Sequence, residues 1–228
     1  MIDDYLLAPI LDENGLPLDG KRDSDAEGMN ISGQKVTVSF ERNHRIAEYE
    51  LDLEKFASRP KILPLPIPKE ELRTNRGIET IAYSPPDSPL RGARVAVTEM
   101  SLNKAGNAFA AVLEGPRKGI FYVQRRDGFD ISDGDFLPGG DLLLLERKYS
   151  FINGIIVRLR LIPGDMIKPD ATVDGRIIFN ADLSYQIDNM EGLDVWQTGD
   201  GSTRVSMISD DNFSVVQRNI YLEFRLAE

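Results

Sequence analysis

Acidic side chains recur along the chain at a spacing that could bring them to one place. Successive acids of a first set are 52, 54 and 58 residues apart: Glu27, Glu79, Asp133 and Glu191. A second set follows a later apolar segment of each repeat: Glu41, Glu99, Glu146 and Asp210. Carboxylates that gather in a small volume repel one another, which raises their pKa values unless a cation lies among them.

Such a gathering of carboxylates suits a hard divalent cation, because Ca²⁺ prefers oxygen ligands. We therefore expect a calcium site, with these candidate metal ligands: Glu27, Glu79, Asp133, Glu191 and Asp210. The alternative is structural, since an acid followed by glycine at the start of a strand often accepts backbone N–H bonds in a tight turn.

An acid-arginine pair occurs twice at the ends of the second apolar segments, as Glu41-Arg42 and Glu146-Arg147. A guanidinium group beside a metal can bind phosphate oxygens through two parallel hydrogen bonds. Glu41, Arg42, Glu146 and Arg147 are therefore the candidate catalytic residues. For arginines in general, pairing with surface acids is the simpler reading.

The segments that carry these residues are short, apolar and separated by turns. Alternating or β-branched runs predict strands at 35–40, 45–51, 78–83, 94–99, 108–112, 119–123, 141–146, 155–161, 176–179, 191–196, 203–208 and 219–226. Units of about four strands at a period of 52–58 residues are typical of propeller blades. The sequence therefore predicts one all-β domain over 1–228, a β-propeller with repeats at 23–74, 75–129, 130–187 and 188–228. Equivalent residues of such blades lie on rings around one axis.

The ends of the repeat array are less regular. The last repeat lacks a fourth strand, whereas an apolar run at 5–11 precedes the first repeat. Pairing of these two segments would complete a blade and remove an exposed edge. The four recognisable four-stranded blades form either a small ring or part of a larger five- or six-bladed ring. Single helical turns are expected at 53–58 and 69–73, and Trp196 is expected in the core.

Composition excludes several classes of function. The formal net charge of −10 disfavours nucleic acid and anionic membranes as partners, because the long-range field repels phosphate. There is no cysteine, and the one histidine, His44, is expected at the surface in a turn. Asp23, Asp25 and Glu27 imitate the start of an EF-hand loop, but an EF-hand is rejected because Gln34 occupies the position of the bidentate glutamate. A calcium loop of another kind at 23–28 stays open. No signal peptide is recognisable at the N-terminus.

Four ordered motifs resemble one known family. They are 22–28, 75–79, 131–133 with 142–147, and 188–193 with 209–214. Together they resemble the bacterial phytase-like family, described as the esterase-like domain of phytase. The resemblance implies a β-propeller, phosphoesterase chemistry, and a periplasmic or secreted location. Compared with the family pattern, we expect the chain to lack a leader and an N-terminal blade before residues 6–18. It also has Thr80 in place of a usual glycine and Asp135 in place of a usual apolar residue.

Three hypotheses about function follow. The first is a phytase-like, calcium-dependent phosphoesterase that acts on a small phosphate ester at the axial acidic ring. The second is a noncatalytic propeller that binds a ligand or protein partner, with acids that are structural or calcium-binding. The third is a lactonase-like hydrolase, because metal-centred propellers also support that chemistry.

Overall fold

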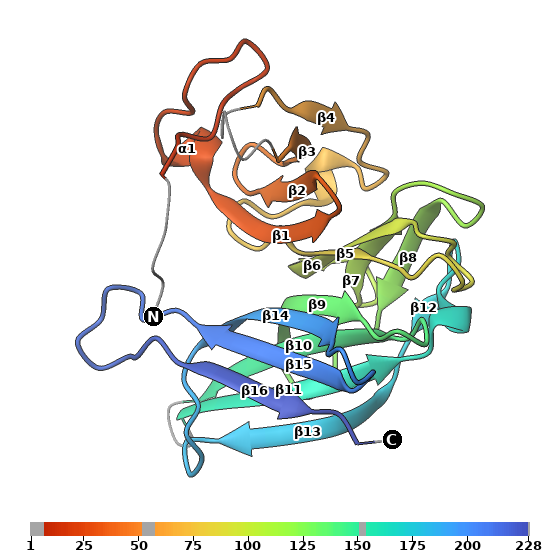
Figure 1. Ribbon diagram of the computed structural model, residues 1–228, viewed down its shortest axis with the longest axis vertical. Helices are drawn as coiled ribbons and strands as arrows, with labels where there is room; N and C mark the ends of the chain where they lie inside the picture. The colour runs from red at the N-terminus through yellow and green to blue at the C-terminus, as the bar shows by residue number, and fades with distance from the viewer. Residues whose placement is uncertain (1–6, 52–57, 151–153, 228) are drawn as a thin grey trace.

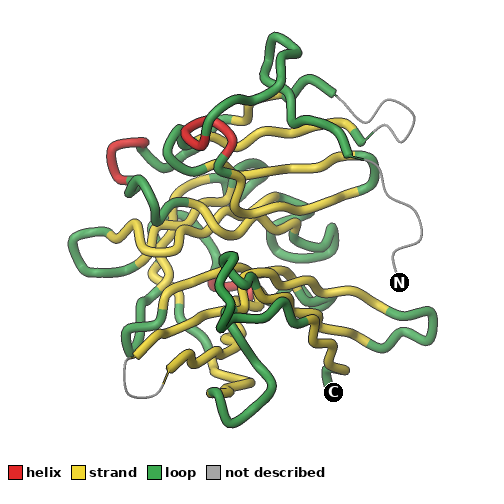
Figure 2. The backbone as a smooth tube through the Cα atoms, turned by 90° about the vertical axis from the view of Figure 1, so that its left-hand side faces the viewer, coloured by secondary structure: helices red, strands yellow, loops and turns green. Residues whose placement is uncertain are grey.

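Four small β-sheets are arranged as a four-blade β-propeller (Figure 1). The structure is a computed structural model, and it describes residues 7–51, 58–150 and 154–227. In the described ranges, helix is confined to short segments (Figure 2), namely α1 (Lys21–Ser24) before the first strand and the 3₁₀ turns η1 (Lys69–Glu71) and η2 (Gly164–Met166) between strands. None of the helices in these described ranges is long and apolar enough to cross a membrane.

Each blade is an antiparallel meander that begins at the propeller axis. Blade 1 contains β1 (Ala26–Ser32), β2 (Lys35–Phe40), β3 (Arg45–Glu50) and β4 (Lys61–Leu63). Blade 2 contains β5 (Ile78–Tyr83), β6 (Arg94–Leu102), β7 (Ala108–Val112) and β8 (Gly119–Val123). Blade 3 contains β9 (Asp130–Phe136), β10 (Leu142–Ser150), β11 (Gly154–Ile162) and β13 (Arg176–Asp182). Blade 4 contains β14 (Met190–Gln197), β15 (Thr203–Ser209) and β16 (Tyr221–Arg225).

The all-β propeller expected from the repeat spacing is confirmed, with two local differences. A short strand that pattern reasoning missed, β12 (Thr172–Val173), pairs in parallel with β8 and extends the sheet of blade 2 with a segment from the third repeat. The N-terminal run expected at 5–11 has no strand structure over 7–10, and Leu11 forms an isolated bridge with Pro17. Residues 5 and 6 of that run, like 53–57 of the expected helical turn, lie outside the described residues. The turn expected near 69–73 is η1.

Apolar side chains between adjacent blades form the core. One buried cluster joins blades 1 and 2, including Ile46, Ile78 and Phe109. A second joins blades 2 and 3, and a third joins blades 3 and 4. Burial on both faces explains the apolar composition of middle strands such as β7 and the first half of β10. The buried residues in the described part of the chain form no comparable cluster between blade 4 and blade 1.

Close approach of neighbouring inner strands near the axis depends on glycine. A Cβ atom at Gly28 of β1 would lie 2.2 Å from the backbone oxygen of Glu79 on β5. Only glycine therefore lets β1 and β5 pack at this separation. The contact fixes the position of the axial ends of blades 1 and 2, where Glu27 and Glu79 are found.

Candidate functional site

A β-bulge interrupts each of the four inner strands at an equivalent place. In each blade the register between the first and second strands shifts directly after one cross-strand pair of residues. These pairs are 26 with 40, 78 with 98, 131 with 146, and 190 with 209. The first residue inside each bulge is Glu27, Glu79, Ser132 or Glu191. A bulge redirects a side chain out of the regular alternation of a strand. The bulge positions therefore define one ring of side chains.

The second strand of each blade supplies a second ring. Its member is the residue that directly follows position 40, 98, 146 or 209. Glu41, Glu99 and Asp210 each donate a backbone N–H to the carbonyl of the residue just before the inner strand, at 2.8, 2.8 and 3.0 Å; the acceptors are Asp25, Gly77 and Asn189. In blade 3, Arg147 occupies the equivalent place, because it pairs with Asp130 next to the pair 131↔146. Each blade thus contributes two side chains near the axis.

All eight positions line one cavity of about 340 Å³, which we call the axial cavity. Its lining is Ala26, Glu27, Glu41, Asn75, Glu79, Glu99, Ser132, Arg147, Glu191 and Asp210. Six of these side chains are acidic, and Arg147 is the only basic one among the described lining residues. Acids from three blades, distant in sequence, converge here with serine and arginine from the third blade.

Burial and mutual repulsion alter the acidity of this cavity. Burial, with the nearby charges of Glu41 and Asp25, raises the pKa of Glu27 to about 7. Burial, with Glu27 and Glu99, raises the pKa of Glu79 to about 9. Burial is also the main cause of the raised pKa values of Glu41 and Glu99. The cavity therefore favours protons or a cation at neutral pH.

Arg147 partly neutralises the acids around it. Its guanidinium forms an ion pair with Glu191, and its Nη2 lies 3.7 Å from Oε1 of Glu99. Nη1 also donates to Oδ1 of Asn189. These contacts hold a cationic fork at the wall of the cavity, on the side of blades 3 and 4.

Three carboxylates meet the spacing that a single cation needs. One oxygen each from Asp25, Glu27 and Glu41 lies within 4.8 Å of the others. Oxygen donors of this kind fit a hard divalent cation such as Ca²⁺. Glu41 also accepts a hydrogen bond from the backbone N–H of Gly77, which fixes one of its oxygens. The residues present therefore fit the calcium ion that the recurring acids of the sequence predict.

The expected metal ligands are brought together with one exception. Glu27, Glu79, Glu191 and Asp210 line the axial cavity, whereas Asp133 lies one residue beyond the bulge of β9. Placing Asp133 at the equivalent position was therefore wrong by one residue. Its Oδ2 accepts the backbone N–H of Leu193 on β14 at 2.7 Å, so this carboxylate links blades 3 and 4.

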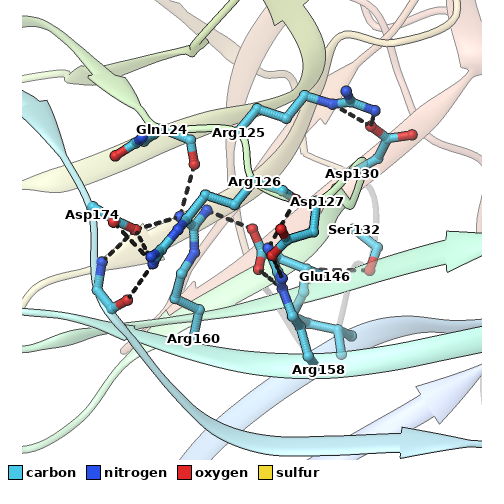
Figure 3. A network of polar contacts seen from close by, with 12 residues as sticks. Gln124, Arg125, Arg126, Asp127, Asp130, Ser132, Glu146, Arg158, Arg160 and Asp174 are labelled. Carbon is cyan, nitrogen blue, oxygen red and sulfur yellow. Dashed lines mark hydrogen bonds and ion pairs between the residues drawn. The ribbon is translucent and has the colours of Figure 1, made fainter.

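The expected catalytic residues divide in the same way. Glu41 and Arg147 line the axial cavity, while Arg42 lies outside its lining and pairs with Asp25 at 2.6 Å. Glu146 is 1% exposed and pairs with Nε of Arg158 at 2.6 Å and Nη2 of Arg160 at 2.5 Å. Figure 3 shows this buried network, in which Asp127 and Asp174 hold the other sides of the two arginines. Glu146 thus contributes to blade 3 rather than to the cavity wall.

Sequence reasoning missed several residues of the site. Asn75 and Ser132 have no acidic or basic group and gave no signal, whereas Asp25 was noticed as part of a possible calcium loop but was not assigned as a ligand. His44, expected on the surface, is only 7% exposed and packs beside Gly77 and Glu41. Trp196, expected in the core, is 39% exposed.

Comparison with known families accounts for nearly the whole chain. The search of curated proteins found no match. The phytase-like family, described as "Esterase-like activity of phytase", matches residues 6–213. Blades 1 to 3, the four axial bulges and the axial cavity lie within that match, which ends before β16 of blade 4. The chain belongs to the phytase-like family.

Proposed function

We propose that the axial cavity is the site of a metal-dependent phosphoesterase that acts on a small phosphate ester. The observation that carries this proposal is the convergence of two positions from every blade on one cavity with six carboxylates. The raised pKa values of Glu27 and Glu79 support it, because an array of this kind is relieved by a bound cation.

Asp25, Glu27 and Glu41 would hold a calcium ion, and Glu79, Glu191 and Asp210 would complete its surroundings. When bound, such an ion polarises a phosphoryl oxygen and orients a water molecule. Expected roles for Asp133 and Arg42 as ligand and catalyst are not part of this proposal, because Asp133 accepts the backbone N–H of Leu193 and Arg42 is paired with Asp25.

The protein's own part is to bind and orient the phosphate. Arg147 offers a guanidinium fork that matches two phosphate oxygens, and its present partners are the carboxylates of Glu191 and Glu99. Transfer of Glu191 to a cation would release this fork for the substrate. Fixed charge of this type stabilises the additional negative charge of a phosphoryl-transfer transition state.

Hydrolysis of p-nitrophenyl phosphate and of phytate by the purified full chain, with calcium and with EGTA, tests the proposal. We expect calcium-dependent turnover that falls at least about tenfold in Glu79→Gln and Arg147→Gln. Glu223→Gln is the matched control, since Glu223 lies on β16 and not in the cavity lining. Calcium binding without turnover of either ester would favour the noncatalytic propeller. A folded protein with neither property would refute the phosphoesterase and would remove the metal from the noncatalytic account as well.

The family also implies export to the periplasm or beyond, and this location stays a prediction. Detection of the full-length gene product in the periplasmic or extracellular fraction of its host would test it.

A further inference from the structure

A second cavity lies between blade 1 and blade 4, where the inner strands β1 and β14 face each other (Figure 1). Its volume is about 620 Å³, and we call it the open cleft. Its walls come from β1, β14, β15 and the start of β16, including Met29, Ile31, Trp196, Ile208 and Tyr221. The other three boundaries between sequential blades are filled by buried apolar clusters.

Apolar side chains line both walls of the open cleft and remain accessible. Ile31 of β1 and Ile208 of β15 are each 53% exposed, and Met29 is also exposed. Large apolar side chains that gather in a hollow, rather than singly on a convex surface, mark a ligand or partner site. The cleft therefore offers apolar contact on two facing sides.

Hydrogen bonds fix the aromatic part of this wall in advance. The Nε1–H of Trp196 donates to Oγ of Ser206 at 3.0 Å. The same Oγ is 2.9 Å from the hydroxyl oxygen of Tyr221. A buried serine thus holds both rings, and a pre-ordered wall loses little conformational entropy when a ligand binds.

The open cleft adjoins the axial cavity. Glu27 and Glu191 belong to the lining of both cavities. A phosphate held near these acids by a cation and Arg147 would therefore leave its ester group at the entrance to the cleft. Asp194 also lines the cleft, so additional phosphate groups on the same ligand would be repelled there.

Building on the proposed function, we propose that the open cleft binds the apolar group of a phosphate monoester whose phosphate occupies the axial cavity. The ligand class is an alkyl or aryl monophosphate. A polyphosphorylated, fully polar ester is disfavoured by the same walls.

Trp196 provides a direct test, because it is the only tryptophan in the sequence. Hexyl phosphate and glycerol 2-phosphate carry the same phosphate and do not absorb in the tryptophan range. With calcium present, we expect hexyl phosphate to shift the emission of the full chain to shorter wavelength and to bind about tenfold more tightly than glycerol 2-phosphate. Equal affinity for the two esters, or no change of emission with hexyl phosphate, would overturn the proposal.

Variants locate the apolar contact. Ile31→Ser and Ile208→Ser are expected to weaken hexyl phosphate binding about fivefold each and to leave glycerol 2-phosphate binding unchanged. Ile177→Ser is the matched control, because Ile177 is 46% exposed on β13 and does not line the cleft. Wild-type affinity in both cleft variants would contradict the proposal. The proposal would also be contradicted if light scattering showed a dimer that the Ile31→Ser substitution dissociates, because the cleft would then be a subunit interface.

Parallel rate measurements separate this inference from the proposed function. Calcium-dependent hydrolysis with the same kcat/KM for hexyl and glycerol esters would uphold the phosphoesterase and reject the apolar subsite. Tight, cleft-dependent binding of hexyl phosphate without hydrolysis would uphold the subsite and reject the phosphoesterase.

Discussion

Calcium binding at the axial cavity should release protons, and the structure sets how many. Glu27, with a pKa of about 7, is half protonated at pH 7, and Glu79, with a pKa of about 9, is almost fully protonated. A cation that binds among these carboxylates requires their ionised forms. These two residues should therefore release about 1.5 protons per calcium ion at pH 7, and only about 0.1 at pH 10.

Calorimetry in two buffers of different ionisation enthalpy, such as PIPES and imidazole, measures this number. The observed enthalpy should differ between buffers in proportion to the protons released. Glu79→Gln should lower the release to about 0.5, while the outer-strand control Glu223→Gln should leave it unchanged. If the glutamine variant no longer binds calcium, an NMR titration of the Glu79 carboxyl in calcium-free wild type should show a midpoint near 9. No proton release at pH 7, or a Glu79 midpoint near 4.5, would refute the reasoning.

Three further predictions concern the stability of the fold. In EGTA, the urea concentration at the midpoint of unfolding should fall as pH rises from about 5 to 9. The folded protein keeps protons on Glu27 and Glu79, whereas the unfolded chain releases them near the ordinary glutamate pKa of 4.5. A midpoint that rises over this range would contradict those pKa shifts. Gly28→Ala should lower the free energy of urea unfolding by about 1–3 kcal/mol, because its Cβ would lie 2.2 Å from the backbone oxygen of Glu79. Gly139→Ala, with open space around it, should lower this free energy by less than about 1 kcal/mol. Equal losses in the two variants would contradict the reasoning. Glu146→Gln should lower the free energy of unfolding by about 3–5 kcal/mol, because it leaves two buried guanidinium groups without their shared carboxylate. A loss equal to that of exposed Glu223→Gln would show that the network does not stabilise blade 3.

The repeat spacing was sufficient to predict the blades. Strands expected at 78–83, 108–112 and 119–123 coincide with β5, β7 and β8. These segments combine β-branched alternation with clear turn residues on each side, so local sequence and tertiary structure agree. The convergence of Glu27, Glu79 and Glu191 followed from the same periodicity, because rotation about an axis brings equivalent residues together.

In the third blade, both ring positions were assigned to a residue next to the correct one. Asp133 and Glu146 are acids next to the equivalent positions, but the bulge in β9 assigns those positions to Ser132 and Arg147. A bulge arises from backbone pairing between two strands, and residue type alone does not determine where the extra residue is inserted. Matching by charge therefore selected the neighbouring acids, which serve instead as buried links within blade 3 and between blades 3 and 4.

Exposure depends on three-dimensional neighbours and was the least predictable property. Trp196 lies on an inner strand and would be buried if another blade surface packed on it, as happens to the apolar residues between blades 3 and 4. His44 lies in a turn, yet the chain around Gly77 covers it. Neither outcome follows from the residue or its neighbours in sequence.

The axial bulges separate the residues that can vary from those that maintain the sheet. A bulged residue lies outside the regular cross-strand pairing, so its side chain can change with little effect on the hydrogen bonds of its blade. Serine already stands at this place in blade 3 and glutamate in the other three blades. Four such positions around one cavity form a set of independently mutable sites, through which duplication and divergence of blades could alter ligand preference while the scaffold is inherited unchanged.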